Sequence, residues 1–212
     1  MANRPVFICK ETKPFYREVD VDFEFYPGFS LKQKQRCIRS LRDSYRNIYG
    51  DRKLLEISSK SEKELGASLS AFHLMKYVPS LNRSVPVECV FQAGKIFENG
   101  GPYLDLMELD PKSARKDPRL HESGRVIAFE YEGKRFPNEP KTMFYDYIYI
   151  SALEENYDLS DQLIFYDGFT DIEFNPERQL NCQARSCAIY LSLIRSGKLK
   201  EYLKSQGDVS LL

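Results

Sequence analysis

Apolar and polar residues alternate in two stretches near the N-terminus, at residues 4–9 and 17–26. In the second stretch the valines and phenylalanines fall on one face and the acidic residues on the other. A period of two residues is that of a β-strand, because successive side chains point to opposite faces. We therefore predict an N-terminal strand pair that ends at Pro27-Gly28.

From Leu31 the apolar positions recur at steps of three and four residues, as on one face of an α-helix. These positions are Ile38, Leu41, Tyr45 and Ile48. Ser30 precedes the stretch and carries the side-chain oxygen that an N-cap needs, while Gly50 lies in a turn after it. We predict an amphipathic helix whose polar face is almost wholly basic.

The rest of the chain predicts mostly helices. The segments are a short strand at 54–58, a helix from a Ser61–Glu64 capping box toward Leu74, a helix at 87–97 ended by residues 99–102, a basic segment at 112–119 broken by Pro118, a hairpin at 126–135 turning at Glu132-Gly133, a helix at 143–153, and a buried helix at 181–194. In residues 143–153 the residue types favour a strand and the length favours a helix, and we take the helix. We expect residues 205–212 to be loose.

The bulk properties are those of a soluble globular protein. The 212 residues suffice for one well-packed domain, and the hydrophobic and charged fractions of 42% and 29% are ordinary. Neither internal repeats nor low-complexity linkers interrupt the chain. We predict one α+β, mostly helical domain, in which residues 1–53 form a strand and basic-helix extension packed on a core of residues 54–212.

Several function classes find no support in the sequence. The absence of a long apolar run and of a signal-peptide layout predicts no membrane contact and a cytoplasmic location. The five cysteines are scattered and there are two histidines, so we expect neither a disulfide scaffold nor a metal site. Cys187 lies in an apolar run and is expected to be a core residue. The phosphate-binding and nucleophile-elbow motifs are missing, and no cofactor is predicted.

The net charge of zero hides an asymmetry along the chain. Residues 31–53 carry eight Lys or Arg against two Asp, whereas residues 139–177 carry ten acids against Lys141 alone. A basic helix often does no more than keep a protein in solution. With Tyr45 and Tyr49 interleaved, it also suits the phosphate backbone and the bases of DNA. The candidate DNA-binding residues are Lys32, Arg36, Arg39, Arg42 and Arg46.

Residues 87–95 place three polar side chains on one stripe of the predicted helix. Glu88, Gln92 and Lys95 stand at positions i, i+4 and i+7, which share a face. Such a stripe is either a solvated face with a favourable side-chain spacing or part of a site. A carboxylate, an amide and an amine together are an unusual choice for a face that only packs on a core.

Three other stretches join this one in a resemblance to a known family. They are residues 69–72 (Leu-Ser-Ala-Phe), 167–174 and 181–184. Their order and spacing over residues 54–195 resemble the NADAR superfamily, small N-glycosidases that act on ADP-ribose and related ribosides. The resemblance is closest to the branch paired with DarT-type toxins, which ADP-ribosylate guanine in DNA.

The resemblance rests on four motifs. Members typically show an L-S-N-F-like stretch, an E-H-x-x-Q-x-x-K-like helix, a later D-x-x-W-G turn, and an Asn before the last helix. The matching residues are Ser70 and Phe72, then Glu88, Gln92 and Lys95, then Asp171 and Asn181. The departures are Ala71 in place of Asn, Cys89 in place of His, and Phe174-Asn175 in place of Trp-Gly. These departures affect residues expected to bind the base or the ribose, and the Glu, Lys and Asp residues expected to carry the chemistry are all present.

The resemblance implies a set of catalytic residues. Cleavage of an N-glycosidic bond passes through a positively charged sugar, so the enzyme needs a carboxylate near that charge and an acid for the leaving base. Glu88 and Asp171 are the candidates for these two tasks. Lys95 either pairs by charge with a phosphate or the leaving base, or, with a pKa lowered by burial, attacks C1 of the sugar and forms an imine.

The remaining candidates would bind the substrate. Ser70, Gln92 and Asn181 would hydrogen-bond ribose hydroxyls or the diphosphate, unless they are ordinary caps. Phe72 and Phe174 would stack on a base, unless they pack in the core. The basic residues Arg115, Lys116 and Arg119 either meet phosphates or form a solvated loop.

Three functions follow as alternatives. The first is an ADP-ribosylglycohydrolase that cleaves ADP-ribose from guanine in single-stranded DNA, as the antitoxin to a DarT-type toxin. The second is an N-glycosidase on small ribosides such as riboflavin-pathway intermediates. The third is a non-catalytic antitoxin that binds ADP-ribose or the toxin. The N-terminal extension and its basic helix favour the first.

Overall fold

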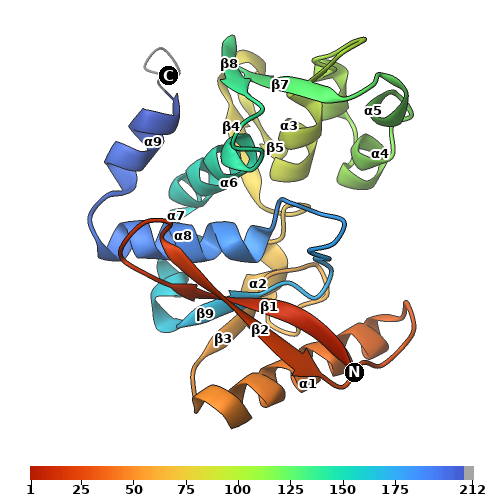
Figure 1. The fold of residues 1–212 in the computed structure, drawn as a ribbon. Helices are drawn as coiled ribbons and strands as arrows, with labels where there is room; N and C mark the ends of the chain where they lie inside the picture. Colours follow the sequence, from red (N-terminus) through yellow and green to blue (C-terminus); the bar gives the residue numbers. More distant parts are fainter. Residues whose placement is uncertain (208–212) are drawn as a thin grey trace. The chain divides into compact units, whose positions relative to one another are not determined.

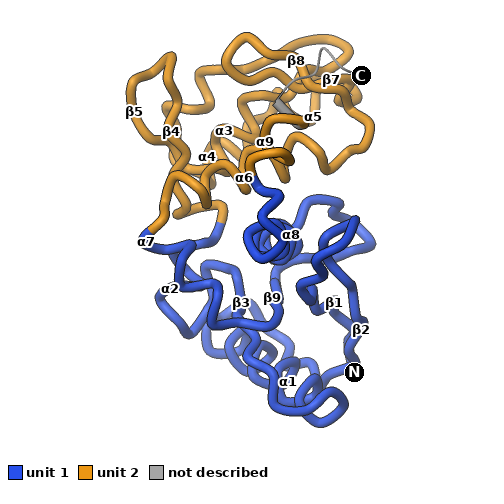
Figure 2. Tube along the Cα trace, turned by 90° about the vertical axis from the view of Figure 1, so that its left-hand side faces the viewer, with its two compact units in different colours: residues 1–70, 158–199 blue, residues 71–157, 200–212 orange. Residues whose placement is uncertain are grey.

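The computed structural model describes residues 1–207 and divides into two compact units, which Figure 2 colours separately. The first unit contains residues 1–70 and 158–199. The second contains residues 71–157 and continues from residue 200. Each unit has its own sheet or sheets and its own helices, labelled along the chain in Figure 1.

The first unit is built on a four-stranded sheet in the order β2–β1–β9–β3. Its strands are β1 (Ala2–Cys9), β2 (Tyr16–Phe23), β3 (Leu54–Glu56) and β9 (Gly168–Thr170). β1 is antiparallel to β2 and β9, whereas β9 runs parallel to β3. The N-terminal strand pair and the short strand after the basic helix are therefore confirmed. β9 has only three residues and carries no periodic signal, and it was not predicted.

Helices α1 (Leu31–Tyr49) and α8 (Gln183–Arg195) lie on opposite faces of this sheet (Figures 1 and 2). The basic helix begins where predicted, because the Ser30 hydroxyl accepts a hydrogen bond of 3.3 Å from the amide of Gln33. It ends at Gly50, whose positive φ suits glycine. α8 is largely buried, as predicted, but begins at Gln183 and not at Asn181.

The apolar face of α1 packs on the sheet. Its buried residues Cys37, Ile38, Leu41 and Tyr45 form one cluster with Val6, Ile8, Val21, Phe23, Leu54 and Ile172. Two predicted members of these apolar faces are exposed. Ile48 lies in the last turn of the helix and is 61% exposed, and Phe25 lies beyond the end of β2 and is 46% exposed. The alternation identified the correct faces but ran past the ends of the packed region.

The second unit contains a hairpin, a three-stranded sheet and two main helices. The strands are β4 (Met75–Val78) with β5 (Arg83–Pro86), and β6 (Lys95–Phe97), β7 (Val126–Tyr131) and β8 (Lys134–Pro137) in that order. The helices are α3 (Val87–Ala93) and α6 (Met143–Glu155). The predicted hairpin is confirmed, and its turn residues Glu132 and Gly133 both have positive φ, as a two-residue turn requires. The helix over residues 143–153 is also confirmed.

Short elements complete the described chain: α2 (Glu64–Ser68), η1 (Pro79–Leu81), η2 (Leu104–Glu108), α4 (Pro111–Arg115), α5 (Arg119–Glu122), α7 (Tyr157–Ser160), η3 (Asp161–Phe165) and α9 (Leu199–Gly207). The capping box predicted at Ser61 is wrong. α2 begins after Lys63 without a side-chain cap, because the Ser61 hydroxyl accepts from the amide of Lys63 outside the helix. The helix stops at Ser68. The tail expected to be loose is helical up to residue 207, and residues 208–212 lie outside the described part.

The structure confirms the α+β fold class. Residues 1–53 share one sheet and one apolar cluster with β3, β9 and Ile172. The division into an extension and a core at residue 53 stays a prediction. No helix within residues 1–207 is both long enough and apolar enough to cross a membrane.

Candidate active site

The helix predicted over residues 87–97 ends early, and the reason is a close approach of three chain segments. α3 stops at Ala93, and Lys95 already belongs to β6, which pairs with β7. A Cβ added at Gly94 would lie 2.7 Å from the carbonyl oxygen of Glu130 and 2.8 Å from Cζ of Phe144. Only glycine fits there, so the backbone turns out of the helix at this point and joins the sheet.

The three predicted side chains of this segment nevertheless come together. Gln92 donates from Nε2 to Oε1 of Glu88 over 2.9 Å, and Lys95 donates from Nζ to Oε1 of Gln92 over 2.6 Å. Glu88 and Gln92 are only 7% and 6% exposed. The arrangement is a chain from a buried carboxylate to a buried amide to a half-buried amine, and the alternative of a solvated polar face is wrong.

Burial makes the Lys95 amine less basic than an ordinary lysine. The pKa of Lys95 falls to about 8, chiefly through loss of water around the ammonium and further through the charge of Arg115, while Glu88 opposes the shift. Nζ also lies 4.8 Å from the ring centroid of Phe91. As the pH rises towards 8, a growing fraction of the molecules therefore carries Lys95 as a neutral amine, the form that attacks a carbon centre.

Two arginines of the basic segment differ in their surroundings: Arg115 lies beside Glu88, whereas Arg119 is paired with other acids. Nε of Arg115 lies 4.0 Å from Oε1 of Glu88, so a cation faces the carboxylate at the start of the chain. Arg119 forms ion pairs with Asp105 and Asp117. Arg119 therefore ties the loop together, while Arg115 remains a candidate for phosphate.

Asp171 belongs to the first unit and directly follows β9. Its side chain is 7% exposed and accepts a hydrogen bond of 3.0 Å from the amide of Glu173. The pKa of Asp171 lies well above its usual range, first because the carboxyl is buried and second because Glu56 is near, while a hydrogen bond from Gln183 lowers it in part. A carboxyl in such surroundings tends to hold its proton.

Glu56 is a buried acid that the sequence analysis missed. It ends β3, is 6% exposed, and its carboxylate accepts from the hydroxyls of Ser58 and Thr170 and from the amide of Ile172. Burial raises the pKa of Glu56 as well. The available signal was a single acid inside the apolar stretch Leu54–Ile57, where a buried carboxylate needs a specific reason.

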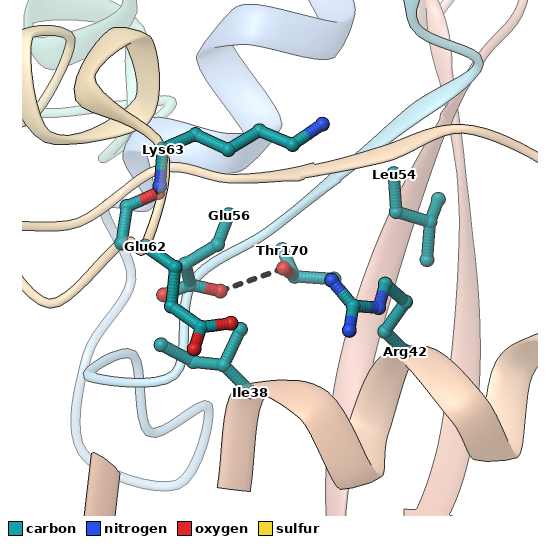
Figure 3. A pocket seen from close by; sticks show the side chains of 8 residues that line it. Ile38, Arg42, Leu54, Glu56, Glu62, Lys63 and Thr170 are labelled. Carbon is teal, nitrogen blue, oxygen red and sulfur yellow. Dashed lines mark hydrogen bonds between the residues drawn. The ribbon is translucent and has the colours of Figure 1, made fainter. Parts of the chain in front are cut away.

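Glu56 and Thr170 also line a pocket of mixed charge (Figure 3). The other lining residues are Ile38, Arg42, Leu54, Ser61, Glu62 and Lys63. Neither Glu88, Lys95 nor Asp171 is among them. The pocket lies beside the Asp171 turn and not over a predicted catalytic side chain.

The predicted binding residues have diverse surroundings. Ser70 is buried and donates to the carbonyl of Ala67 over 2.8 Å, which is the local tie that the alternative interpretation described. Phe174 is buried, with its ring 6.3 Å from that of Phe7, so it packs in the core. Phe72 is half-buried. Oδ1 of Asn181 is buried and has no hydrogen-bond partner among residues 1–207, which is unusual for a buried amide oxygen and fits a ligand contact.

Several arginines of the basic helix already form ion pairs with acidic residues. Arg39 pairs with Glu62 over 2.6 Å, Arg46 pairs with Asp51 over 2.5 Å, and Arg42 lies 3.8 Å from Asp43. The guanidinium of Arg36 lies 3.8 Å from the ring centroid of Tyr26, and Lys32 is exposed. Contact with DNA stays a prediction, and Lys32 and Arg36 are the residues best placed to make it.

Glu88, Gln92, Lys95 and Phe72 belong to the second unit, whereas Ser70, Asp171, Phe174 and Asn181 belong to the first. That both sets line one pocket stays a prediction. Cys187 is fully buried, which confirms it as a core residue. Within residues 1–207, no group of three or more His, Cys, Asp or Glu side chains could hold a metal ion.

A family model described as DarT1-associated NADAR antitoxin matches residues 2–211. The chain belongs to this NADAR antitoxin family. A comparison with curated proteins found no match. The family model confirms the resemblance inferred from the motifs, and its range also includes the N-terminal strands and the basic helix.

Proposed function

We propose that this NADAR antitoxin is an N-glycosidase that removes ADP-ribose from guanine in DNA and so reverses the modification made by a DarT-type toxin. The observation that carries the proposal is the hydrogen-bonded chain from the buried Glu88 through Gln92 to the half-buried Lys95, with a Lys95 pKa of about 8. A lysine that only balanced charge would gain nothing from a lowered pKa, whereas a nucleophilic amine depends on it.

The chemistry assigns one task to each group. The neutral Lys95 amine attacks C1 of the ribose while the bond from C1 to the guanine nitrogen breaks. The guanine takes a proton from an acid, and Asp171 suits this task because burial and the nearby Glu56 raise its pKa and so favour its protonated form. Glu88 stabilises the positive charge that develops on the sugar. Loss of a proton and ring opening give an imine, and water then hydrolyses it to ADP-ribose and the free amine.

Other residues would hold the substrate. The unpartnered Oδ1 of Asn181 is available to a ribose hydroxyl, and Arg115 beside Glu88 is available to a phosphate. Lys32 and Arg36 on α1 would meet the backbone of single-stranded DNA. This part of the proposal explains why a basic helix accompanies a small glycosidase.

The test is turnover of an oligonucleotide carrying ADP-ribosylated guanine. We expect release of free ADP-ribose and restoration of the unmodified base by substoichiometric protein. Borohydride added during turnover should attach ADP-ribose to Lys95, and the Lys95→Ala protein should show no adduct, while Lys200→Ala serves as a matched control on an exposed lysine. Neutralisation of a toxin only at equal stoichiometry, without release of ADP-ribose, would instead identify a binding antitoxin.

A further inference from the structure

The Glu56 carboxylate holds both residues that flank Asp171. Its Oε2 accepts from Oγ1 of Thr170 over 2.6 Å, and its Oε1 accepts from the amide of Ile172 over 2.8 Å. Figure 3 shows the first of these bonds, which joins β3 to the end of β9. A single side chain thus fixes the turn that carries Asp171 on both sides.

This arrangement is more than a tie between strands. The backbones of β3 and β9 already pair in parallel from Leu54 with Gly168 to Glu56 with Thr170. A buried carboxylate adds a desolvation cost that an amide or an apolar side chain would avoid. The hydrogen bond from Ser58 over 2.7 Å, with those from Thr170 and Ile172, offsets part of that cost. Burial raises the pKa of Glu56 too, but the three hydrogen bonds that its oxygens accept favour the ionised form, so the side chain supplies negative charge beside Asp171.

The other charged groups around the turn do not supply that charge as directly. Glu173 is exposed and pairs with Lys34 of α1 over 2.7 Å. From the segment before α2, Glu62 pairs with Arg39, and Lys63 bonds to the Tyr166 hydroxyl. Arg42 of α1 lines the same pocket as Glu56. From the side of α8, Gln183 and the Cys182 thiol face Asp171, and both are neutral.

We propose that Glu56 is a positioning residue for Asp171: it fixes the turn through Thr170 and Ile172, and its charge keeps the proton on Asp171. The inference rests on the proposed function, in which Asp171 gives a proton to the leaving guanine. The direction of the Asp171 shift, with Glu56 as its largest charge contribution, agrees with the geometry.

The first test needs no substrate. The carboxyl carbon of Asp171 is titrated by NMR in the wild-type protein and in Glu56→Gln. Gln keeps an oxygen that accepts from Ile172 and removes the negative charge, so ionisation of Asp171 becomes easier. We expect its titration midpoint to move to lower pH by about one unit or more. The matched control Glu62→Gln, which removes a carboxylate from the same pocket but not from the turn, should leave the midpoint in place.

The second test is the pH profile of turnover on an ADP-ribosylated guanine nucleoside. In Glu56→Gln the limb assigned to Asp171 should move to lower pH in step with the NMR midpoint. We expect kcat to fall about ten-fold with KM within about two-fold, because a misplaced acid affects the transition state more than binding. A support with a purely structural role would lower activity without moving the limb.

A second pair of variants guards against a Glu56→Gln protein that fails to fold. Thr170→Val removes the hydroxyl that stabilises the Glu56 charge, and Thr170→Ser retains it. The Asp171 midpoint should fall in the first and stay in the second. An unchanged midpoint in folded Glu56→Gln or Thr170→Val overturns the inference. A wild-type protein that turns over no ADP-ribosylated substrate overturns the proposed function instead, and the NMR result still decides the role of Glu56.

Discussion

Lys95 donates a hydrogen bond of 2.6 Å to the side-chain oxygen of Gln92, although the two residues lie in different elements, a strand and a helix. The bond survives the helix end at Gly94 because the lysine side chain reaches back across the turn. Gln92 in turn donates to Glu88, so one amide sets the separation between amine and carboxylate. This geometry makes the roles of the three residues separable by substitution.

Lys95→Ala should lower turnover of ADP-ribosylated DNA by a factor on the order of 100 or more, the usual scale for a positioned catalytic group. The reason is loss of the nucleophile at the sugar. The measurement is single-turnover release of ADP-ribose, with Lys200→Ala as the control. A folded Lys95→Ala protein with the wild-type rate would remove Lys95 from the mechanism.

The wild-type rate should rise with pH through about 8, because the neutral amine fraction grows as pH passes the Lys95 pKa. Glu88 raises that pKa, so Glu88→Gln should move this limb to lower pH while reducing kcat. Gln92→Glu places a second negative charge next to the amine and should move the limb to higher pH. If the pH profiles of Glu88→Gln and Gln92→Glu shifted in the same direction, they would contradict the effect assigned to the Glu88 charge.

Gln92→Leu should separate orientation from charge. The variant keeps a side chain of similar size but removes both hydrogen bonds, to Glu88 and from Lys95. We expect kcat to fall about ten-fold or more, as for a lost positioning contact. The kinetics of Gln92→Leu and Gln92→Glu should be compared at a pH above the Lys95 limb of each variant's profile. Equal activity of Gln92→Leu and wild type would show that the amide only fills space.

Gly94→Ala should destabilise the protein by about 1–3 kcal/mol, the range for overpacking a close contact. The added Cβ meets the Glu130 carbonyl and the Phe144 ring. Urea unfolding measures the change. In a Phe144→Leu background the cost of Gly94→Ala should shrink, because one of the two obstacles is smaller. A neutral Gly94→Ala would mean that the helix ends for another reason.

Reversal of Lys32 and Arg36 to Glu should weaken turnover on modified oligonucleotides and make it less dependent on salt. These two cations have no ion pair with an acid among those of residues 1–207, unlike Arg39 and Arg46. Turnover of the modified nucleoside should be nearly unchanged. The control reverses Lys200 and Lys204 on α9, which are also exposed. Equal losses of activity on the oligonucleotide and on the nucleoside would show that the two cations support the fold and do not bind DNA.

Local signals in the sequence predicted the elements whose causes are local. The hairpin at 126–135 turns on Glu132-Gly133, and α1 begins at its own cap, so both were visible. The end of α3 depends on Glu130 and Phe144, which lie far along the chain from Gly94. No pattern within residues 87–97 contains that information.

The same limit applies to the site. Glu56 meets Thr170 across 114 positions of sequence, through strands of three residues each that carry no periodicity. The chain from Glu88 to Lys95 was visible because its members lie within one segment. That Lys95 and Asp171 line one pocket was predicted from family resemblance alone, and it stays a prediction.

Ile172 follows Asp171 and lies in the apolar cluster beneath α1, together with Ile38 and Leu41. The apolar face of the basic helix therefore packs on Ile172 and supports the turn that carries the proposed acid, while its other face is exposed to solvent. A shortened protein that starts after this helix would leave Ile172 without cover and Asp171 without a fixed direction. The N-terminal segment would then be indispensable even for a substrate no larger than a nucleoside.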